Sequence, residues 1–149
     1  MNMRKITIAL ATLGPIGFLP APGTMASLIT LILVYVLWSV GFNFLLYGCA
    51  LGVVTLVAYY SINQALTVFN QTDPAHIVID EVVGCLLVFW GINVTWYSVV
   101  IGFILFRLLD IYKPLGIARL EECGGAQGIL LDDIAAGVLS NIMLRVIFC

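Results

Sequence analysis

A pair of adjacent carboxylates, Asp80 and Glu81, stands at the edge of an apolar stretch and is the first candidate for chemistry. The residues that follow, 82–86, are apolar apart from Gly84. Carboxylates this close to hydrocarbon need a cation or hydrogen-bond donors beside them. His76 lies four residues before Asp80, so a continuous helix would place both on one face, where His76 either transfers a proton or packs. The competing interpretation is a helix start, at which acidic residues favour the dipole.

A second pair, Asp132 and Asp133, follows a glycine-rich turn over residues 123–128. Backbone N–H groups of such a turn can bind an anion, while the two carboxylates offer oxygen ligands to a metal. Acidic residues in the first turn of a helix are the competing explanation. However, this pair lies between Leu131 and Ile134, where unpaired charge is costly beside lipid, so we expect a functional role.

Two cations and an acid recur at intervals of three residues in Arg107, Asp110 and Lys113. On a helix this spacing places them along one stripe, which ends where Pro114 stops the helix. The guanidinium and ammonium groups could hold phosphate oxygens while the carboxylate contributes to a metal site. For Arg107 and Lys113 taken singly, an equally good interpretation is a side chain that reaches along a membrane surface to water.

Five carboxylates around one pocket would repel one another unless a cation lies among them. Ligands that are all oxygen favour Mg²⁺ or Mn²⁺ over zinc, so the sequence predicts a binding site for Mg²⁺ or Mn²⁺. The expected metal ligands are Asp80, Glu81, Asp110, Asp132 and Asp133. Three nearby charges are interpreted instead as solvated loop residues without a role: Arg119, Glu121 and Glu122.

Hydrolysis of a phosphomonoester at a membrane surface is the reaction that these groups suit. A metal ion would polarise the phosphoryl group and orient or ionise a water, or the carboxylate of Asp80 or Asp110 would attack phosphorus directly. The expected catalytic residues are Asp80, Asp110, Lys113 and His76, and the expected phosphate ligands are Arg107 and Lys113.

The elements that position these residues are long and apolar. The chain is 62% hydrophobic and 9% charged, and it has no Asp, Glu, Lys or Arg over residues 6–72 or 82–106. Only a bilayer solvates such surfaces, and there the backbone must be helical. We predict a single domain over 1–149, an all-α polytopic membrane bundle of four to five apolar helices. The expected segments are 25–38, 44–69, 77–90, 96–109 and 129–148.

The segment 14–23 is rich in Gly and Pro, which rules out a regular helix and predicts a re-entrant or interfacial segment. The apolar stretch 6–13 before it imitates a secretory signal but lacks a small-residue cleavage site, so we expect it to remain in the protein. The cysteines have no metal-binding spacing and are interpreted as reduced packing residues. They are Cys49, Cys85, Cys123 and Cys149.

The distribution of charge predicts the topology. The breaks at 39–43 and 91–95 are uncharged, whereas the N-terminus and the loop 114–128 contain or adjoin Lys and Arg. By the positive-inside rule the basic ends are cytoplasmic. An alternating path then places the predicted site, together with Asp73, at the cytoplasmic face and Arg145 near the opposite face.

Four ordered blocks of sequence resemble the motifs of the phosphatidylglycerophosphatase A family, which are bacterial inner-membrane lipid phosphatases. The blocks are Pro20-Ala-Pro-Gly-Thr24, Ile79-Asp-Glu-Val-Val-Gly84, Phe106-Arg-x-x-Asp-x-x-Lys-Pro114 and Gly124-Gly-x-x-Gly-x-x-x-Asp-Asp-x-x-Ala-Gly137. Their shared order and spacing make the resemblance specific. Two departures, Met25-Ala26 in place of Trp-Gly and Leu115-Gly116 in place of Trp-Pro, remove no carboxylate.

The resemblance implies Mg²⁺-dependent removal of the terminal phosphate from phosphatidylglycerophosphate, giving phosphatidylglycerol for phospholipid synthesis. It also implies a multi-pass protein of the bacterial cytoplasmic membrane whose partners are this lipid and the bilayer. The alternative is a small ion-coupled transporter or channel, whose acids would bind a cation near the bilayer midplane. Acids at segment ends on one face favour the enzyme. The small net charge of −2 gives no reason to expect a nucleic acid partner, and no oligomeric state follows from the sequence.

Overall fold

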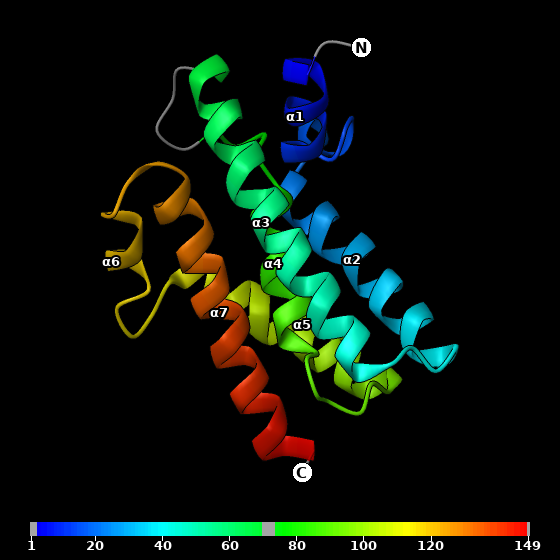
Figure 1. The fold of residues 1–149 in the computed structure, drawn as a ribbon. Helices are drawn as coiled ribbons and strands as arrows, with labels where there is room; N and C mark the ends of the chain where they lie inside the picture. The colour runs from blue at the N-terminus through cyan, green and yellow to red at the C-terminus, as the bar shows by residue number, and fades with distance from the viewer. Residues whose placement is uncertain (1–2, 70–73, 149) are drawn as a thin grey trace.

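The computed structural model describes residues 3–69 and 74–148, and these residues form α-helices and one 3₁₀ helix without a β-strand. The elements, shown in Figure 1, are α1 (Met3–Ala11), η1 (Ile16–Phe18), α2 (Pro22–Ser39), α3 (Phe44–Phe69), α4 (Ile79–Val88), α5 (Trp96–Tyr112), α6 (Ala118–Glu121) and α7 (Gly125–Phe148). The prediction of an all-α fold is therefore confirmed. Asp73 and Cys149, which the sequence analysis names, lie outside the described residues.

The five apolar segments that the sequence predicts overlap α2, α3, α4, α5 and α7. Helix α7 begins at Gly125 instead of residue 129, because the glycine-rich segment is itself helical, so Asp132 and Asp133 do not lie in its first turn. The Gly- and Pro-rich segment forms turns and η1, but its last residues belong to α2, which begins at Pro22 instead of residue 25. Proline is accepted there because the first turn of a helix has no partner for the missing N–H group. The position of this segment relative to a bilayer stays a prediction.

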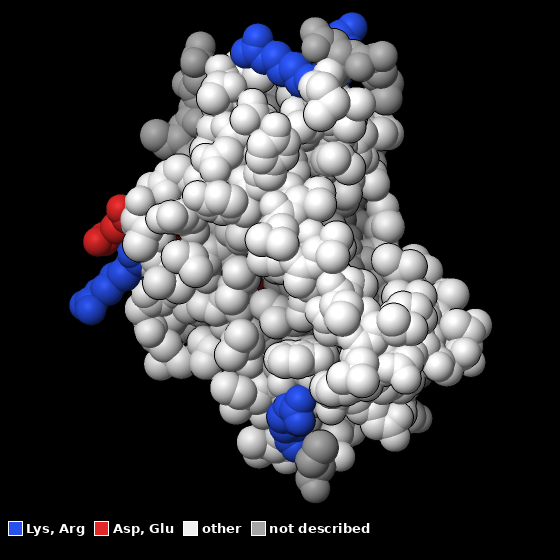
Figure 2. Space-filling view, viewed as in Figure 1, with Lys and Arg blue, Asp and Glu red and all other residues white. Residues whose placement is uncertain are grey.

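Most of the apolar surface of α2 and α3 faces outward. Among the described helices these two are long and apolar enough to cross a membrane. Only 33% of the most apolar 18-residue stretch of α2, and 28% of that of α3, is buried in the protein. Ile32 on α2 is 66% exposed and Leu56 on α3 is 73% exposed. Figure 2 shows a largely uncharged surface, with Lys and Arg at two opposite ends and a small charged group at one side. A membrane is the solvent that fits such a surface.

Helix α4 lies in the centre of the bundle, where it contacts α2, α3, α5 and α7 (Figure 1). It has ten residues, and most of them are buried. Gly137 on α7 packs directly on α4, because a Cβ atom there would lie 2.5 Å from the Gly84 carbonyl oxygen. The glycines thus let two helix backbones touch, as small residues do in membrane bundles.

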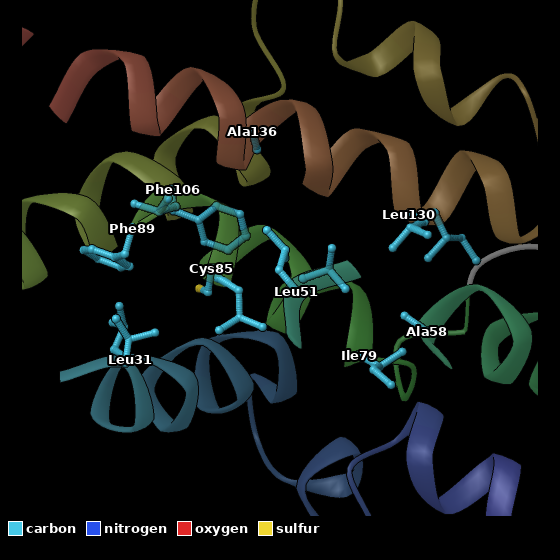
Figure 3. Packing of buried hydrophobic residues seen from close by; sticks show 14 of the residues in the cluster. Leu31, Leu51, Ala58, Ile79, Cys85, Phe89, Phe106, Leu130 and Ala136 are labelled. Carbon is cyan, nitrogen blue, oxygen red and sulfur yellow. The ribbon is translucent and has the colours of Figure 1, made fainter. Parts of the chain in front are cut away.

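The apolar core surrounds α4 on several sides. Figure 3 shows Cys85 of α4, Phe89 directly after it and Phe106 of α5 close together. These residues lie between Leu31 of α2 and Ala136 of α7. Phe89 and Phe106 are fully buried. Cys85 is buried in this core, and Cys49 and Cys123 are exposed; all three are free thiols. This packing holds the N-terminal end of α4 in one position, which matters because Asp80 and Glu81 lie there.

Candidate active site

A cleft of about 540 Å³ opens where the first turns of α2 and α4 meet the end of α5 and the first half of α7. Several parts of the chain that are distant in sequence contribute to it. Its lining consists of Ala21, Pro22, Gly23, Thr24, Pro74, Ala75, Ile77, Asp80, Glu81, Arg107, Asp110, Lys113, Glu121, Gly124, Gly125, Ile129, Asp132 and Asp133. The cleft therefore contains most of the charged residues that the sequence predicts to act together.

Three carboxylates, Asp80, Glu81 and Asp133, converge on one point in this cleft; we call them the carboxylate cluster. One ligand oxygen from each lies within 4.8 Å of the other two. Asp80 is 8% exposed and Asp133 is 2% exposed. Asp80 Oδ1, Glu81 Oε2 and Asp133 Oδ1 are buried and have no hydrogen-bond partner among the residues that the structure describes. Buried charges without partners are strongly unfavourable, so this arrangement calls for a cation that all three can contact.

The contact between Gly84 and Gly137 explains why the cluster forms. Asp80 lies four residues before Gly84, and Asp133 lies four residues before Gly137. Residues four apart share a face of a helix, so each acid stands about one turn above the glycine contact. Because α4 and α7 touch at these glycines, the two carboxylates are brought to the same level on facing helices. The close packing also includes the Phe106 ring, whose Cε2 would lie 2.5 Å from a Cβ on Gly84.

Arg107 is held at the cleft by Asp110. Its Nη1 donates to Asp110 Oδ2 at 2.6 Å, as expected for residues three apart on α5. Its Nε is buried and has no partner within residues 3–69 and 74–148, so this donor is available to a ligand. The first turn of α2 packs against the same guanidinium, because a Cβ on Gly23 would lie 3.4 Å from Arg107 Nη1 and in collision with the Glu81 carboxylate.

Lys113 is placed by the end of α5. It caps the helix in the left-handed conformation, with φ of 44°, and its amide donates to Leu109 O. Its ammonium donates to Asp132 Oδ2 at 2.5 Å and also to Glu121. Burial lowers the pKa of Lys113, but the hydrogen bonds to the two carboxylates outweigh it and raise the pKa above the ordinary value. The side chain of Lys113 is therefore protonated and positively charged at neutral pH.

Seven of the predicted site residues line the cleft: Asp80, Glu81, Arg107, Asp110, Lys113, Asp132 and Asp133. His76 does not. Its Nδ1 donates to Gly17 O at 2.9 Å, and its ring stacks on Phe18 with centroids 4.7 Å apart and lies beside Phe69. The expectation that it shares a helical face with Asp80 fails because α4 begins only at Ile79.

Two residues of the cleft, Glu121 and Gly23, are not predicted from the sequence. Glu121 is exposed, as expected for a solvated charge, but it belongs to α6, and the expectation that it has no place in the site is wrong, because it lines the cleft and forms an ion pair with Lys113. Gly23 receives no role in the sequence analysis, although its lack of a side chain makes room for Glu81. The available signal was the Pro-Gly pair at a helix start, where a side chain is absent from the turn that faces the acids.

The sequence as a whole matches the family model described as phosphatidylglycerophosphatase A over residues 9–148. The chain belongs to this family. Among curated relatives, the phosphatidylglycerophosphatases A of Escherichia coli and Haemophilus influenzae are 31% and 34% identical, covering 80% and 84% of this chain and 69% and 77% of their own. A Bacteroides thetaiotaomicron protein provisionally named as a phosphatidylinositol-3-phosphatase is 36% identical, over 87% of this chain and 86% of its own. No solved structure matches the chain.

Membership in the phosphatidylglycerophosphatase A family makes the chain an enzyme, a phosphatase. The resemblance noted in the four sequence blocks is thereby confirmed. The alternative of an ion-coupled transporter or channel receives no support from the family. The cleft of this phosphatidylglycerophosphatase A family member brings carboxylates and basic side chains together, which are the kinds of group that phosphoryl transfer uses.

Proposed function

We propose that the chain hydrolyses the terminal phosphomonoester of phosphatidylglycerophosphate to phosphatidylglycerol and phosphate, in a Mg²⁺-dependent reaction of phospholipid synthesis. The observation that supports this most directly is the carboxylate cluster, in which three buried oxygens lack partners beside two fixed cations. The family gives the class of reaction. The names of the E. coli and H. influenzae relatives support this choice of lipid.

The donor set of the cleft suits Mg²⁺. Asp80, Glu81 and Asp133 would hold it, and Asp110 and Asp132 belong to the predicted ligand set as neighbours of the cluster. All of these donors are carboxylate oxygens, which hard cations such as Mg²⁺ and Mn²⁺ prefer. Six acidic side chains and two basic ones line the cleft, so a cation would relieve their repulsion. When bound, Mg²⁺ would offset this charge and polarise the phosphoryl oxygens.

Arg107 and Lys113 would bind the phosphate. Arg107 has a free donor at Nε, and Lys113 remains charged and has a third N–H beyond those given to Asp132 and Glu121. Fixed cations of this kind stabilise charge that grows on the phosphoryl oxygens as the bond to the leaving group breaks. Their ion pairs with carboxylates keep them in place before the substrate arrives.

Asp80 is the group that we assign to proton transfer. Its carboxylate has two oxygens, so one would contact the cation while the other would accept a proton from the attacking water. The water oxygen forms a bond to phosphorus, the bond from phosphorus to the glycerol oxygen breaks, and the leaving oxygen takes up the proton. We assign His76 to packing, because its ring lies against Phe18 and not in the cleft.

The orientation in the membrane is part of the proposal. We place the chain in the bacterial cytoplasmic membrane with four to five apolar helices, the Gly- and Pro-rich segment at or in the interface, and the cleft open to the cytoplasm. The basic residues of α1 and the uncharged connections 40–43 and 89–95 at the other ends of the helices favour this orientation.

Phosphatidylinositol 3-phosphate is the second candidate substrate, because the Bacteroides relative carries a name of that activity. Both lipids present a phosphomonoester to the same cations, so they differ only in the alcohol that leaves. We favour phosphatidylglycerophosphate because two relatives and the family share that name.

The test is phosphate release by purified protein in detergent, from each of the two lipids, with Mg²⁺ or with EDTA. We expect release from phosphatidylglycerophosphate that requires Mg²⁺ and is lost in Asp80→Asn and Asp133→Asn. Arg145→Gln is the matched control, because Arg145 donates to Asn141 and to the Trp90 carbonyl near the end of α7 that is far from the cleft. Release that persists in EDTA contradicts the metal site, and preferential release from the inositol lipid contradicts the substrate.

A further inference from the structure

An apolar groove of about 240 Å³ lies between α2 and α5 on the outside of the bundle. From α2 it is lined by Leu28, Leu31 and Ile32. From α5 it is lined by Trp96, Val99, Val100 and Phe103. Leu31 and Val99 are buried and form its floor, whereas Ile32 and Trp96 are more than half exposed and form its sides. Every lining side chain is apolar, so the groove suits a hydrocarbon ligand.

The groove and the cleft occupy the same seam between two helices. At the cleft, α2 and α5 meet where Gly23 faces Arg107. From there Leu28 lies five residues further along α2 and Phe103 lies four residues back along α5, which is roughly 6 to 8 Å along either helix axis. Both helices leave the cleft in the same direction. The phosphate-binding end and the apolar groove therefore follow one another along one line.

A lipid phosphate in the cleft must direct its acyl chains away from the charged residues. The α2–α5 seam starts beside Arg107 at the cleft, and the apolar groove lies further along the same seam on the outside of the bundle. A lipid that enters sideways from the bilayer would keep its chains in apolar surroundings throughout. We propose that this groove binds an acyl chain of the lipid substrate; the inference rests on the proposed function in that the substrate is a membrane lipid.

The groove would act by orientation and not by hydrophobic driving force. A chain that moves from lipid to the groove stays in apolar surroundings, so little is gained by transfer, and what remains is the shape of the contact. Contacts with parts of a substrate that do not react can position the reacting group. We therefore expect the groove to set how well the phosphate reaches Arg107 and the carboxylate cluster.

The first test fills the groove. Val100→Trp and Leu28→Trp place a large ring in it, and Leu56→Trp on the exposed face of α3 is the matched control. Activity is measured on long-chain phosphatidylglycerophosphate and on its deacylated head group. We expect kcat/KM for the long-chain lipid to fall by about tenfold or more, with a change below about threefold for the head group and for the control. An equal loss on both substrates, or no loss on either, overturns the inference.

The second test needs no turnover and separates this inference from the proposed function. The chain has three tryptophans, so Trp38→Phe with Trp90→Phe leaves Trp96 as the reporter in the groove. The probe is a phosphonate analogue of phosphatidic acid with brominated acyl chains, diluted in phosphatidylcholine vesicles with Mg²⁺. We expect it to quench Trp96 more strongly than the same mole fraction of brominated phosphatidylcholine.

Equal quenching by the two brominated lipids overturns the acyl-chain site even if the enzyme hydrolyses phosphatidylglycerophosphate. Selective quenching by a protein that releases phosphate from neither lipid supports the site while the proposed function fails. The two proposals can thus be wrong independently.

Discussion

Replacement of Gly23 by alanine tests whether the position of Glu81 controls the reaction. The added Cβ would lie 2.9 Å from Glu81 Cδ and in collision with its Oε1. Carbon atoms are in ordinary contact at about 3.5 to 4.0 Å, so the carboxylate must move by roughly 0.6 to 1 Å. Because a displacement of about 1 Å at a reacting centre can cost on the order of 100-fold in rate, we expect kcat to fall by about that factor.

The fold should tolerate this change. Alanine is favoured over glycine within a helix by up to about 1 kcal/mol, which offsets part of the local crowding at the start of α2. The assay is the initial rate of phosphate release together with thermal unfolding in detergent. Gly52→Ala is the matched control, since Gly52 is an exposed helical residue of α3 and a Cβ there would meet no atom of the described residues within 4 Å.

A Gly23→Ala variant that keeps the full rate would refute the claim that the position of the Glu81 carboxylate controls the rate. The claim is also refuted if Gly52→Ala loses as much activity as Gly23→Ala. A large drop in the unfolding temperature of Gly23→Ala alone would instead assign the loss to the fold and contradict the expected tolerance.

Three further predictions concern single residues around the cleft. Lys113→Met should lower kcat by roughly 10²- to 10³-fold while KM changes less, because a fixed donor to the phosphoryl oxygens is lost; an unchanged kcat would remove Lys113 from the site. Gly137→Ala should destabilise the protein by about 1 to 3 kcal/mol in denaturant unfolding, since the new methyl meets the backbone of Gly84, which cannot retreat. His76→Asn should keep kcat within about threefold because an amide can still donate to Gly17 O, whereas a proton-transfer role predicts a loss of roughly 10²- to 10⁴-fold.

The helical segments could be predicted because backbone N–H and C=O groups inside a bilayer must hydrogen-bond within their own segment, as they do in a helix. Long apolar stretches without charge must form helices there, and the five stretches do overlap helices. The proximity of Asp80 to Asp133 could also be predicted, because helices that cross the bilayer in alternating directions place both residues at one end of the bundle. What the sequence could not supply is the register, which the contact of Gly84 with Gly137 determines through backbone packing.

The wrong expectation for His76 has its physical cause in where α4 begins. The i,i+4 spacing of His76 and Asp80 implies a shared face only on a continuous helix, and α4 starts at Ile79. His76 therefore lies in a turn, where Phe18 and the Gly17 carbonyl fix its ring. Glu121 was missed for a different reason: it is the last residue of the short helix α6, and its contact with Lys113 forms only in the folded chain and leaves no periodic pattern in the sequence.

The unequal lengths of the helices have a consequence for the bilayer around them. Helix α3 has 26 residues and is about 39 Å long, whereas α2 and α5 have 18 and 17 residues and are about 26 Å long. A hydrocarbon layer of about 30 Å is thinner than the first and thicker than the other two. Hydrophobic mismatch would then thin the membrane beside α2 and α5, so lipid head groups there are drawn inward toward the level of the cleft.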